Sequence, residues 1–206
     1  MKLYTFFRGS SPFRVRIALN LKGLAYESSS VHLAKGEQRQ PAYSAVNPQS
    51  LVPALVLDDG HVLTQSLAII EYLDETHPEP RLIPADPLGR ARVRALSLIV
   101  ACEIHPLNNA RTLAHLRKGM KQTEDQVNAW YRHWVADGLA KVESSLTHFA
   151  GTGMFCHGDA PTMADCCLVP QVFNAKRFEC DTQPYPTVMR VFDECMKLDA
   201  FDRAQP

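Results

Sequence analysis

The residues best suited to chemistry lie at the first expected strand-to-helix turn. Arg8 ends a short apolar strand, and Ser10, Ser11 and Pro12 follow at the start of a helical pattern. Pro12 suits the first helical position, which makes Ser11 the predicted N-cap with Ser10 just before it. The open N–H groups and the positive dipole end of a helix attract an anion such as a thiolate. A serine hydroxyl there either lowers the pKa of a bound thiol or merely caps the helix.

A second candidate anion site precedes the helix expected over residues 67–74. Gln65 and Ser66 lead into this helix, and Ser66 is its predicted N-cap. Further upstream, Val52-Pro53 enters a strand, where proline suits a sheet edge or a cis turn. A cis bond would present the N–H and C=O of Val52 to a peptide-like ligand, and the alternative is an ordinary turn proline.

The second half of the chain offers one polar corner and one late arginine. The segment from His105 to Arg111 interrupts a long helical pattern, and Pro106 is expected to kink or break the helix there. Such a break turns polar side chains toward one place, although a simple corner with solvated asparagines also fits the pattern. Arg177 lies near the end of a later helix, where a surface arginine is the alternative.

Composition bears against several classes of function. Lys and Arg total 22, as do Asp and Glu, so the formal net charge is zero and no nucleic-acid partner is expected. No apolar run approaches the ~20 residues that span a membrane. With no export signal, we expect a cytoplasmic protein with reduced thiols. No metal-binding spacing, P-loop or G-x-G-x-x-G pattern occurs, and the adjacent Cys166 and Cys167 are expected in the core.

The elements that position these residues change in kind along the chain. Strand and helix signals alternate over the first eighty residues as βαβ followed by ββα, with Asp58-Asp59-Gly60 as a hairpin turn. The proline-rich stretch at residues 77–87 reads as a linker. Helices are then predicted over residues 88–104, 106–118, 124–149, 162–175 and 186–198, and Thr162 to Asp165 is a capping signal. We therefore expect an α/β domain over 1–80, a linker over 81–87 and an all-helical domain over 88–206.

Three segments carry a resemblance to a known family. Phe7 to Leu19 resembles the zeta-class glutathione transferase signature F-R-S-S-C-S-W-R-V-R-I-A-L. Gln65 to Leu73 resembles the family pattern Q-S-x-A-I-x-x-Y-L, and the segment from Leu168 to Asp181 resembles its C-terminal pattern L-V-P-Q-V-x-N-A-x-R-F-x-V-D. Gly9 stands where the signature has its first serine, and Ser11 stands where it has cysteine.

The resemblance implies a fold, a cofactor and a set of site residues. The fold is a thioredoxin-like N-terminal domain with an all-α C-terminal domain, usually assembled as a homodimer, and the cofactor is glutathione. The catalytic residues are Arg8 and either Ser10 or Ser11, since Gly9 has no hydroxyl. The implied glutathione contacts are Ser10, Ser11, Gln38, Val52, Pro53, Gln65, Ser66, His105, Asn108 and Asn109. The implied substrate-binding residues are Arg8, Arg111 and Arg177, whose forked guanidinium groups suit a doubly negative keto acid.

The implied activity is the cis–trans isomerisation of a maleyl keto acid, maleylpyruvate or maleylacetoacetate, to its fumaryl isomer. Glutathione serves as a cofactor and is not consumed. One alternative is a transferase that conjugates or dehalogenates small electrophiles such as α-halo acids. Another is a non-catalytic binding protein on the same fold. The sequence leaves open both the keto acid and the choice between Ser10 and Ser11.

Overall fold

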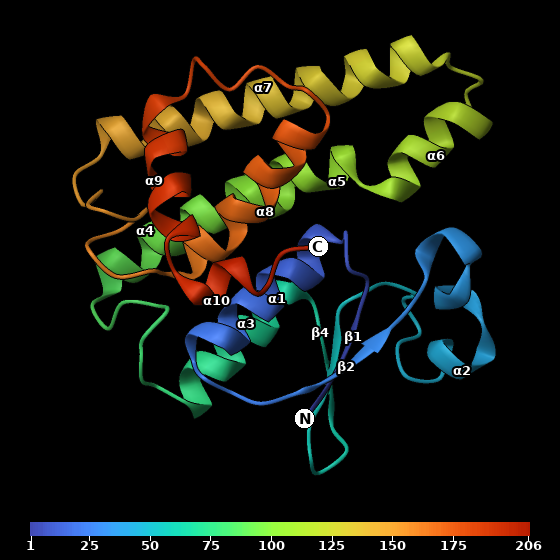
Figure 1. Cartoon of the computed structure of the whole chain (residues 1–206), viewed down its shortest axis with the longest axis horizontal. Helices are drawn as coiled ribbons and strands as arrows, with labels where there is room; N and C mark the ends of the chain where they lie inside the picture. Colours follow the sequence, from blue (N-terminus) through green and yellow to red (C-terminus); the bar gives the residue numbers. More distant parts are fainter. The chain divides into compact units, whose positions relative to one another are not determined.

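The computed structural model describes every residue, Met1–Pro206, and the chain divides into two compact units. Unit 1 comprises Met1–Ile83 together with Met196–Pro206, and unit 2 comprises Pro84–Cys195 (Figure 1). The sequence predicts domains over 1–80 and 88–206, whereas residues 196–206 group with unit 1.

Unit 1 is built on a four-stranded sheet with the order β2-β1-β3-β4. The strands are β1 (Lys2–Thr5), β2 (Glu27–Ser30), β3 (Ala54–Val56) and β4 (Val62–Thr64). β1 and β2 run parallel, while β3 is antiparallel to both β1 and β4. This arrangement confirms the predicted α/β half.

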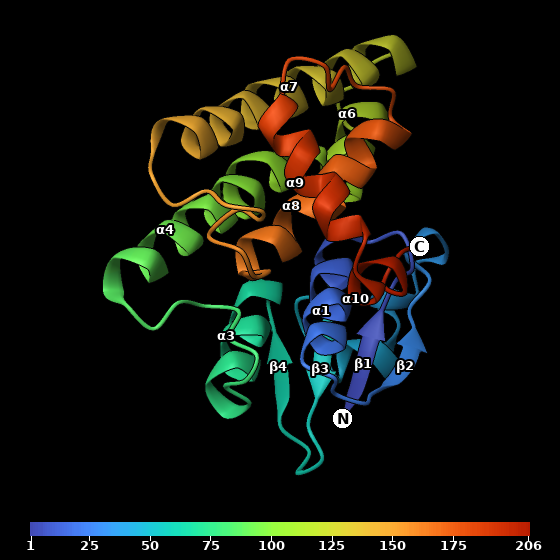
Figure 2. The same ribbon diagram turned by 60° about the vertical axis from the view of Figure 1, so that its left-hand side comes forward.

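Helices cover both faces of the sheet because successive strand residues point to opposite sides. Leu3 packs with residues of α1 (Ser10–Leu21) and α3 (Ser66–Thr76), which lie together on one face (Figure 2). Tyr4 packs on the other face with Tyr43 of the short helix α2 (Pro41–Ser44). The fully buried residues of the first core are Leu3, Val15, Leu19, Leu55, Ile69 and Leu73.

The predicted hairpin between β3 and β4 is confirmed. The Leu57 N–H donates to the His61 carbonyl at 2.9 Å across the turn. Gly60 has a φ of 88°, a value that residues with a side chain rarely adopt. The glycine in the Asp-Asp-Gly turn is therefore what lets the two strands reverse so tightly.

A buried ion pair holds the proline-rich stretch against the end of unit 1. The Lys22 ammonium donates to Asp74 Oδ1 at 2.8 Å and to the His77 and Pro80 carbonyls at 2.7 and 2.9 Å. Asp74 also accepts the Leu82 N–H at 2.7 Å. Because every buried charge here has polar partners, residues 77–82 are fixed to α1 and α3.

Unit 2 is helical, which confirms the predicted second half. Its helices are α4 (Pro87–Leu98), the π-helix η3 (Ile99–Ile104), α5 (His105–Asn108), α6 (Ala110–Lys118), α7 (Glu124–His148), α8 (Met163–Arg177) and α9 (Pro186–Met196). α7 approaches η3 closely at Gly138, where a Cβ atom would clash with Ile104 Cγ1. The predicted capping box at Thr162 is formed, and Cys166 and Cys167 are fully buried as predicted. None of the helices is both long enough and apolar enough to cross a membrane.

Candidate functional site

The first strand-to-helix turn is a tight corner between β1 and α1. The chain turns through Phe6–Gly9, where the Gly9 N–H donates to the Phe6 carbonyl at 2.9 Å. Gly9 is the N-cap of α1, and its carbonyl accepts the Phe13 N–H at 3.0 Å. The prediction that Ser11 caps the helix and Pro12 begins it is therefore wrong, because α1 begins at Ser10.

The position of the proline explains this error. All N–H groups of a first helical turn lack an acceptor within the helix, so proline is tolerated throughout that turn and does not mark its first residue. Ser10 and Ser11 consequently occupy the first two helical positions, half-buried, and Arg8 just before them is exposed. Both hydroxyls still lie at the positive end of the helix dipole, so both stay candidates for a contact with an anion.

The second element is the entry into β3. The Val52–Pro53 peptide bond is cis, which is the first of the two alternatives that the sequence left open. Pro53 is buried and Val52 half-buried. Val52 takes no part in the ladder between β1 and β3, whose pairing ends at Ala54. This peptide edge therefore lies beside the sheet and outside its hydrogen-bond ladder.

The start of α3 differs from the prediction. Gln65, with a φ of 67°, is the N-cap, and the prediction that Ser66 caps this helix is wrong. Ser66 is the first helical residue, is buried, and accepts a hydrogen bond from Arg14 Nη1 at 3.3 Å. The Gln65 side chain is exposed and donates to Gln49 Oε1 at 3.1 Å.

Sequence reasoning missed Arg14, which links the two helix starts of unit 1. Its side chain on α1 is only 2% exposed, and its contact with Ser66 joins the beginning of α1 to the beginning of α3. The signal was available, because Arg14 and Arg16 interrupt an otherwise apolar run. A buried charge needs polar partners, so charged residues within a buried helix indicate fixed contacts.

Gln38 is the predicted glutathione contact whose loop is hardest to place from sequence. It lies in the short 3-10 helix η2 (Glu37–Arg39). Its Oε1 atom is buried and has no hydrogen-bond partner within the protein. Buried amide oxygens usually have a hydrogen-bond partner, so the accepting capacity of this atom is unused within the protein.

The polar corner of unit 2 is built differently from the expected proline break. η3 widens the helix before Pro106, which then lies in the first turn of α5, and the helical path breaks only at Asn109. A π-turn accommodates residues that do not fit the α-helical ladder. His105 is half-buried at the start of α5, and Arg111 is exposed in the first turn of α6.

The two neighbouring asparagines have different surroundings. Asn109 Oδ1 accepts the Thr112 N–H at 3.0 Å, and its Nδ2 donates to the Pro106 carbonyl at 3.1 Å, so its amide caps α6. The Asn108 side chain is 9% exposed, and neither of its amide atoms has a partner within the protein. Asn108 is therefore the asparagine whose hydrogen-bonding capacity is unused.

Arg177 lies exposed in the last turn of α8. Its guanidinium carbon is 5.0 Å from the centre of the Phe178 ring, and Phe178 stacks on Tyr131 of α7 at 4.0 Å between ring centres. Burial raises the pKa of the Tyr131 phenol, which therefore stays neutral. The stacked rings give Arg177 a fixed apolar base while its charge faces outward.

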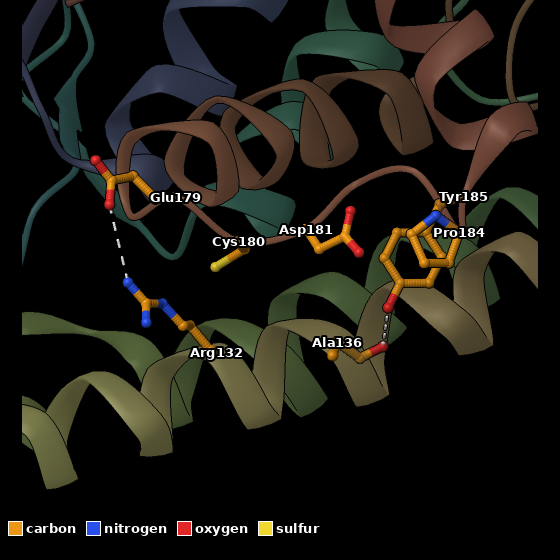
Figure 3. Close-up of a pocket in the computed structure, with 7 residues that line it drawn as sticks. All are labelled: Arg132, Ala136, Glu179, Cys180, Asp181, Pro184 and Tyr185. Atoms are coloured by element: carbon orange, nitrogen blue, oxygen red, sulfur yellow. Dashed lines mark hydrogen bonds and ion pairs between the residues drawn. The ribbon is translucent and has the colours of Figure 1, made fainter.

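A pocket of about 480 Å³ lies in unit 2 between α7 and the segment after α8 (Figure 3). Its lining residues are Arg132, Ala136, Glu179, Cys180, Asp181, Pro184 and Tyr185. Arg132 lies 3.9 Å from the Glu179 carboxylate, and Asp181 adds a second acidic group. Two carboxylates beside one guanidinium suit a doubly negative ligand poorly, and no predicted site residue lines this pocket.

The arrangement of ionisable side chains does not point to a metal centre. No cluster of three or more His, Cys, Asp or Glu side chains has a geometry that could hold a metal ion.

Comparisons with known proteins extend the likeness over the whole chain. Residues 10–76 match the family described as glutathione S-transferase, N-terminal domain. A maleylpyruvate isomerase from Ralstonia is 52% identical over all of this chain and 97% of its own length. The holo structure of a zeta-class maleylpyruvate isomerase matches with a TM-score of 0.97 at 51% identity, covering 100% of this chain and 97% of its own. A maleylacetoacetate isomerase from Methylobacterium extorquens, solved with malonate and GSH, matches with a TM-score of 0.97 at 44% identity, covering 100% and 96%.

The fold of unit 1 together with these matches identifies the chain as a glutathione transferase. Within that class, the chain belongs to the zeta-class family of maleylpyruvate and maleylacetoacetate isomerases.

Proposed function

We propose that the protein is a glutathione-dependent isomerase that converts maleylpyruvate or maleylacetoacetate to its fumaryl isomer. The observation that carries this proposal is the full-length identity of 52% to an enzyme named for this reaction. The corner between β1 and α1 supplies the hydroxyls and the arginine that such chemistry requires.

The first requirement is a sulfur anion at neutral pH. Bound glutathione supplies a thiolate that can add to a conjugated double bond and leave again, so that the bond rotates while it is single. Ser10 or Ser11 donates a hydrogen bond to the sulfur, and together with the dipole of α1 this favours its ionised form. The start of α3, at Gln65 and Ser66, suits the γ-glutamyl carboxylate. The further proposed contacts are Gln38, Val52, Pro53, His105, Asn108 and Asn109.

The second requirement is a set of cations for the two carboxylates of the keto acid. Arg8, Arg111 and Arg177 are all exposed, and a guanidinium pairs with a carboxylate through two parallel hydrogen bonds. Arginine also stabilises the negative charge that develops on the keto side during the reaction. The malonate in the Methylobacterium relative supports a dicarboxylate as the ligand class.

We also propose that the enzyme is a cytoplasmic homodimer without nucleic-acid or membrane partners. The family resemblance supports the dimer, and the balanced charge of the chain supports the absence of a nucleic-acid partner. Sedimentation of the purified protein tests the dimer.

The experiment that tests the function follows the absorbance of each maleyl keto acid with and without glutathione. We expect conversion to the fumaryl isomer only in the presence of glutathione, while the amount of glutathione stays constant. Loss of glutathione in proportion to product would instead identify a conjugating or dehalogenating transferase. Retention on a glutathione column without any turnover would identify a binding protein. Full turnover in the absence of glutathione would reject the mechanism.

Separate Ser10→Ala and Ser11→Ala variants should show which hydroxyl faces the sulfur. A hydrogen bond to a charged group contributes about 1.5–3 kcal/mol, so its loss should raise the pKa of the bound thiol by about one to two units. Less thiolate then exists at neutral pH, and the activity profile moves to higher pH. Ultraviolet absorbance of the bound thiolate against pH measures the shift. Replacement of the serine that does not face the sulfur should leave the pH profile unchanged. If both variants show the wild-type profile, neither serine has this role.

A further inference from the structure

Arg16 is a buried arginine that the proposed function does not use. Its side chain on α1 is 8% exposed, and it has no carboxylate partner. Burial lowers the pKa of this guanidinium because the charged form loses water. Its charge is balanced instead by the oxygen atoms of four residues, one hydroxyl and three main-chain carbonyls.

Three of these oxygens belong to the end of β1 and to the Phe6–Gly9 turn that follows it. Arg16 Nη1 donates to Thr5 Oγ1 at 3.0 Å and to the Phe6 carbonyl at 3.5 Å, and Nη2 donates to the Phe7 carbonyl at 3.0 Å. The Phe6 carbonyl also accepts the Gly9 N–H, which closes the turn that carries Arg8. The hydrogen bonds from the guanidinium to the Phe6 and Phe7 carbonyls fix the orientation of the two peptide groups just before Arg8.

The fourth oxygen belongs to the C-terminal segment of unit 1. Arg16 Nε donates to the Ala204 carbonyl at 2.9 Å. The short helix α10 (Asp199–Asp202) lies beside α1 (Figure 2), and Ala204 just after it is fully buried. Asn20, one turn further along α1, donates to the Ala200 carbonyl at 2.9 Å. Arg16 therefore joins the Phe6–Gly9 turn to the C-terminal segment, whereas the Asn20 side chain bonds to the C-terminal segment alone.

We propose that Arg16 is a positioning residue for catalysis: it holds the Phe6–Gly9 turn, and with it Arg8, at a place set by the C-terminal segment. The inference rests on the proposed function, because Arg8 is assigned there to the substrate. All three nitrogens of the planar Arg16 guanidinium donate hydrogen bonds, and the single ammonium group of a lysine cannot reach the same acceptors.

Arg16→Lys tests this role while it keeps the positive charge. Misplacement of a binding group by about 1 Å can cost up to about 100-fold, so we expect kcat/KM for the keto acid to fall about 10- to 100-fold, mainly through KM. The dissociation constant of glutathione should change much less than KM, because only Ser10 and Ser11 among its proposed contacts adjoin the turn, and no hydrogen bond of Arg16 reaches the start of α3 or the Val52–Pro53 edge. Equal losses in both constants would indicate general damage and overturn the proposal.

Asn20→Ala is the matched control. It removes one hydrogen bond between α1 and the C-terminal segment and leaves the turn untouched. We expect a lower Tm for both variants and a raised KM for Arg16→Lys alone. The same KM for the two variants would mean that Arg16 has only a structural role.

Amide hydrogen exchange measures how firmly the Phe6–Gly9 turn is held, and it needs no substrate. In Arg16→Lys the Gly9 amide should exchange faster than in the wild type, and in Asn20→Ala it should not. If the wild type fails to isomerise either keto acid, the proposed function falls while this measurement still tests the coupling. Unchanged exchange at Gly9 in Arg16→Lys would overturn the coupling whatever the reaction is.

A truncated chain that ends at Arg203 tests whether the C-terminal segment sets the position of the turn. It also provides a second variant if Arg16→Lys does not fold. It removes the Ala204 acceptor and keeps the three acceptors near the turn. We expect a rise in KM smaller than that of Arg16→Lys, together with faster exchange at Gly9. Wild-type values for both would show that the C-terminal segment does not set the position of the turn.

Discussion

Replacing Asp165 with alanine is expected to lower the free energy of unfolding by about 3–5 kcal/mol. The carboxylate is fully buried at the start of α8. It accepts the N–H and the hydroxyl of Thr162 at 2.7 and 2.8 Å and the Cys156 N–H at 2.8 Å. Alanine would leave these three donors buried without an acceptor, and each such donor costs about 1–3 kcal/mol.

The surrounding thiols strengthen this expectation. Burial raises the pKa of the Cys156 and Cys195 thiols, so both stay protonated, and the Cys195 S–H donates to Asp165 Oδ1 at 3.9 Å. Burial also raises the pKa of Asp165 itself. Each hydrogen-bond partner of the carboxylate described here is a donor. Asp165→Asn should therefore destabilise the protein as well, because its NH₂ group would face donors where the native oxygen accepts.

Urea or thermal unfolding of both variants measures the loss. Asp86→Ala is the matched control, since Asp86 is an exposed N-cap of α4 that accepts one N–H, from Gly89, at 2.7 Å. We expect this exposed cap to contribute only about 1 kcal/mol. Similar losses for Asp165→Ala and Asp86→Ala would contradict the argument that burial makes the difference.

Features that depend on a few neighbouring residues were predictable from the sequence. The hairpin at Asp58-Asp59-Gly60 follows from a glycine that adopts a positive φ, and the start of α8 follows from Thr162 and Asp165. In both cases the partner atoms lie within three or four residues of one another, so the sequence window contains the whole interaction. The alternation of strands and helices in unit 1 is visible for the same reason.

Features that depend on distant partners were not predictable in this way. Ser66 is a good N-cap by type, but its hydroxyl is engaged by Arg14, 52 residues away in the chain. Arg16 contacts Ala204 across 188 residues, and no local pattern indicates that contact. The start of α1 at Ser10 likewise depends on how the turn before it is held. The sequence therefore predicts which residues form the candidate site but not the contacts that support them.

The polar corner of unit 2 illustrates the same limit. Asn108 and Asn109 are equivalent by residue type, and both fit a contact with glutathione. The structure uses the Asn109 amide to cap α6 and leaves the Asn108 amide buried without a partner. Which of two adjacent amides is available depends on where the helix breaks, and the break falls at Asn109, three residues after Pro106.

Arg8→Ala is expected to lower kcat/KM for the keto acid by about 10²- to 10³-fold, as the loss of one stabilising donor in an active site commonly does. The Arg8 side chain is exposed, its guanidinium carbon lies 5.0 Å from the centre of the Phe7 ring, and it forms no ion pair with a carboxylate of the protein. Its charge is therefore available to an anion. Because no buried contact is removed, the free energy of unfolding should stay within about 0.5 kcal/mol of the wild type.

Steady-state kinetics with saturating glutathione and a thermal unfolding curve measure the two expectations together. Arg8→Lys should recover only part of the activity, because lysine keeps the charge and loses the forked geometry that matches a carboxylate. Arg81→Ala, which removes another exposed arginine of unit 1, should leave kcat/KM unchanged. Nearly full activity of Arg8→Ala that still required glutathione would contradict a role for Arg8 in substrate binding. The two carboxylates of the keto acid would then be assigned to Arg111 and Arg177 alone.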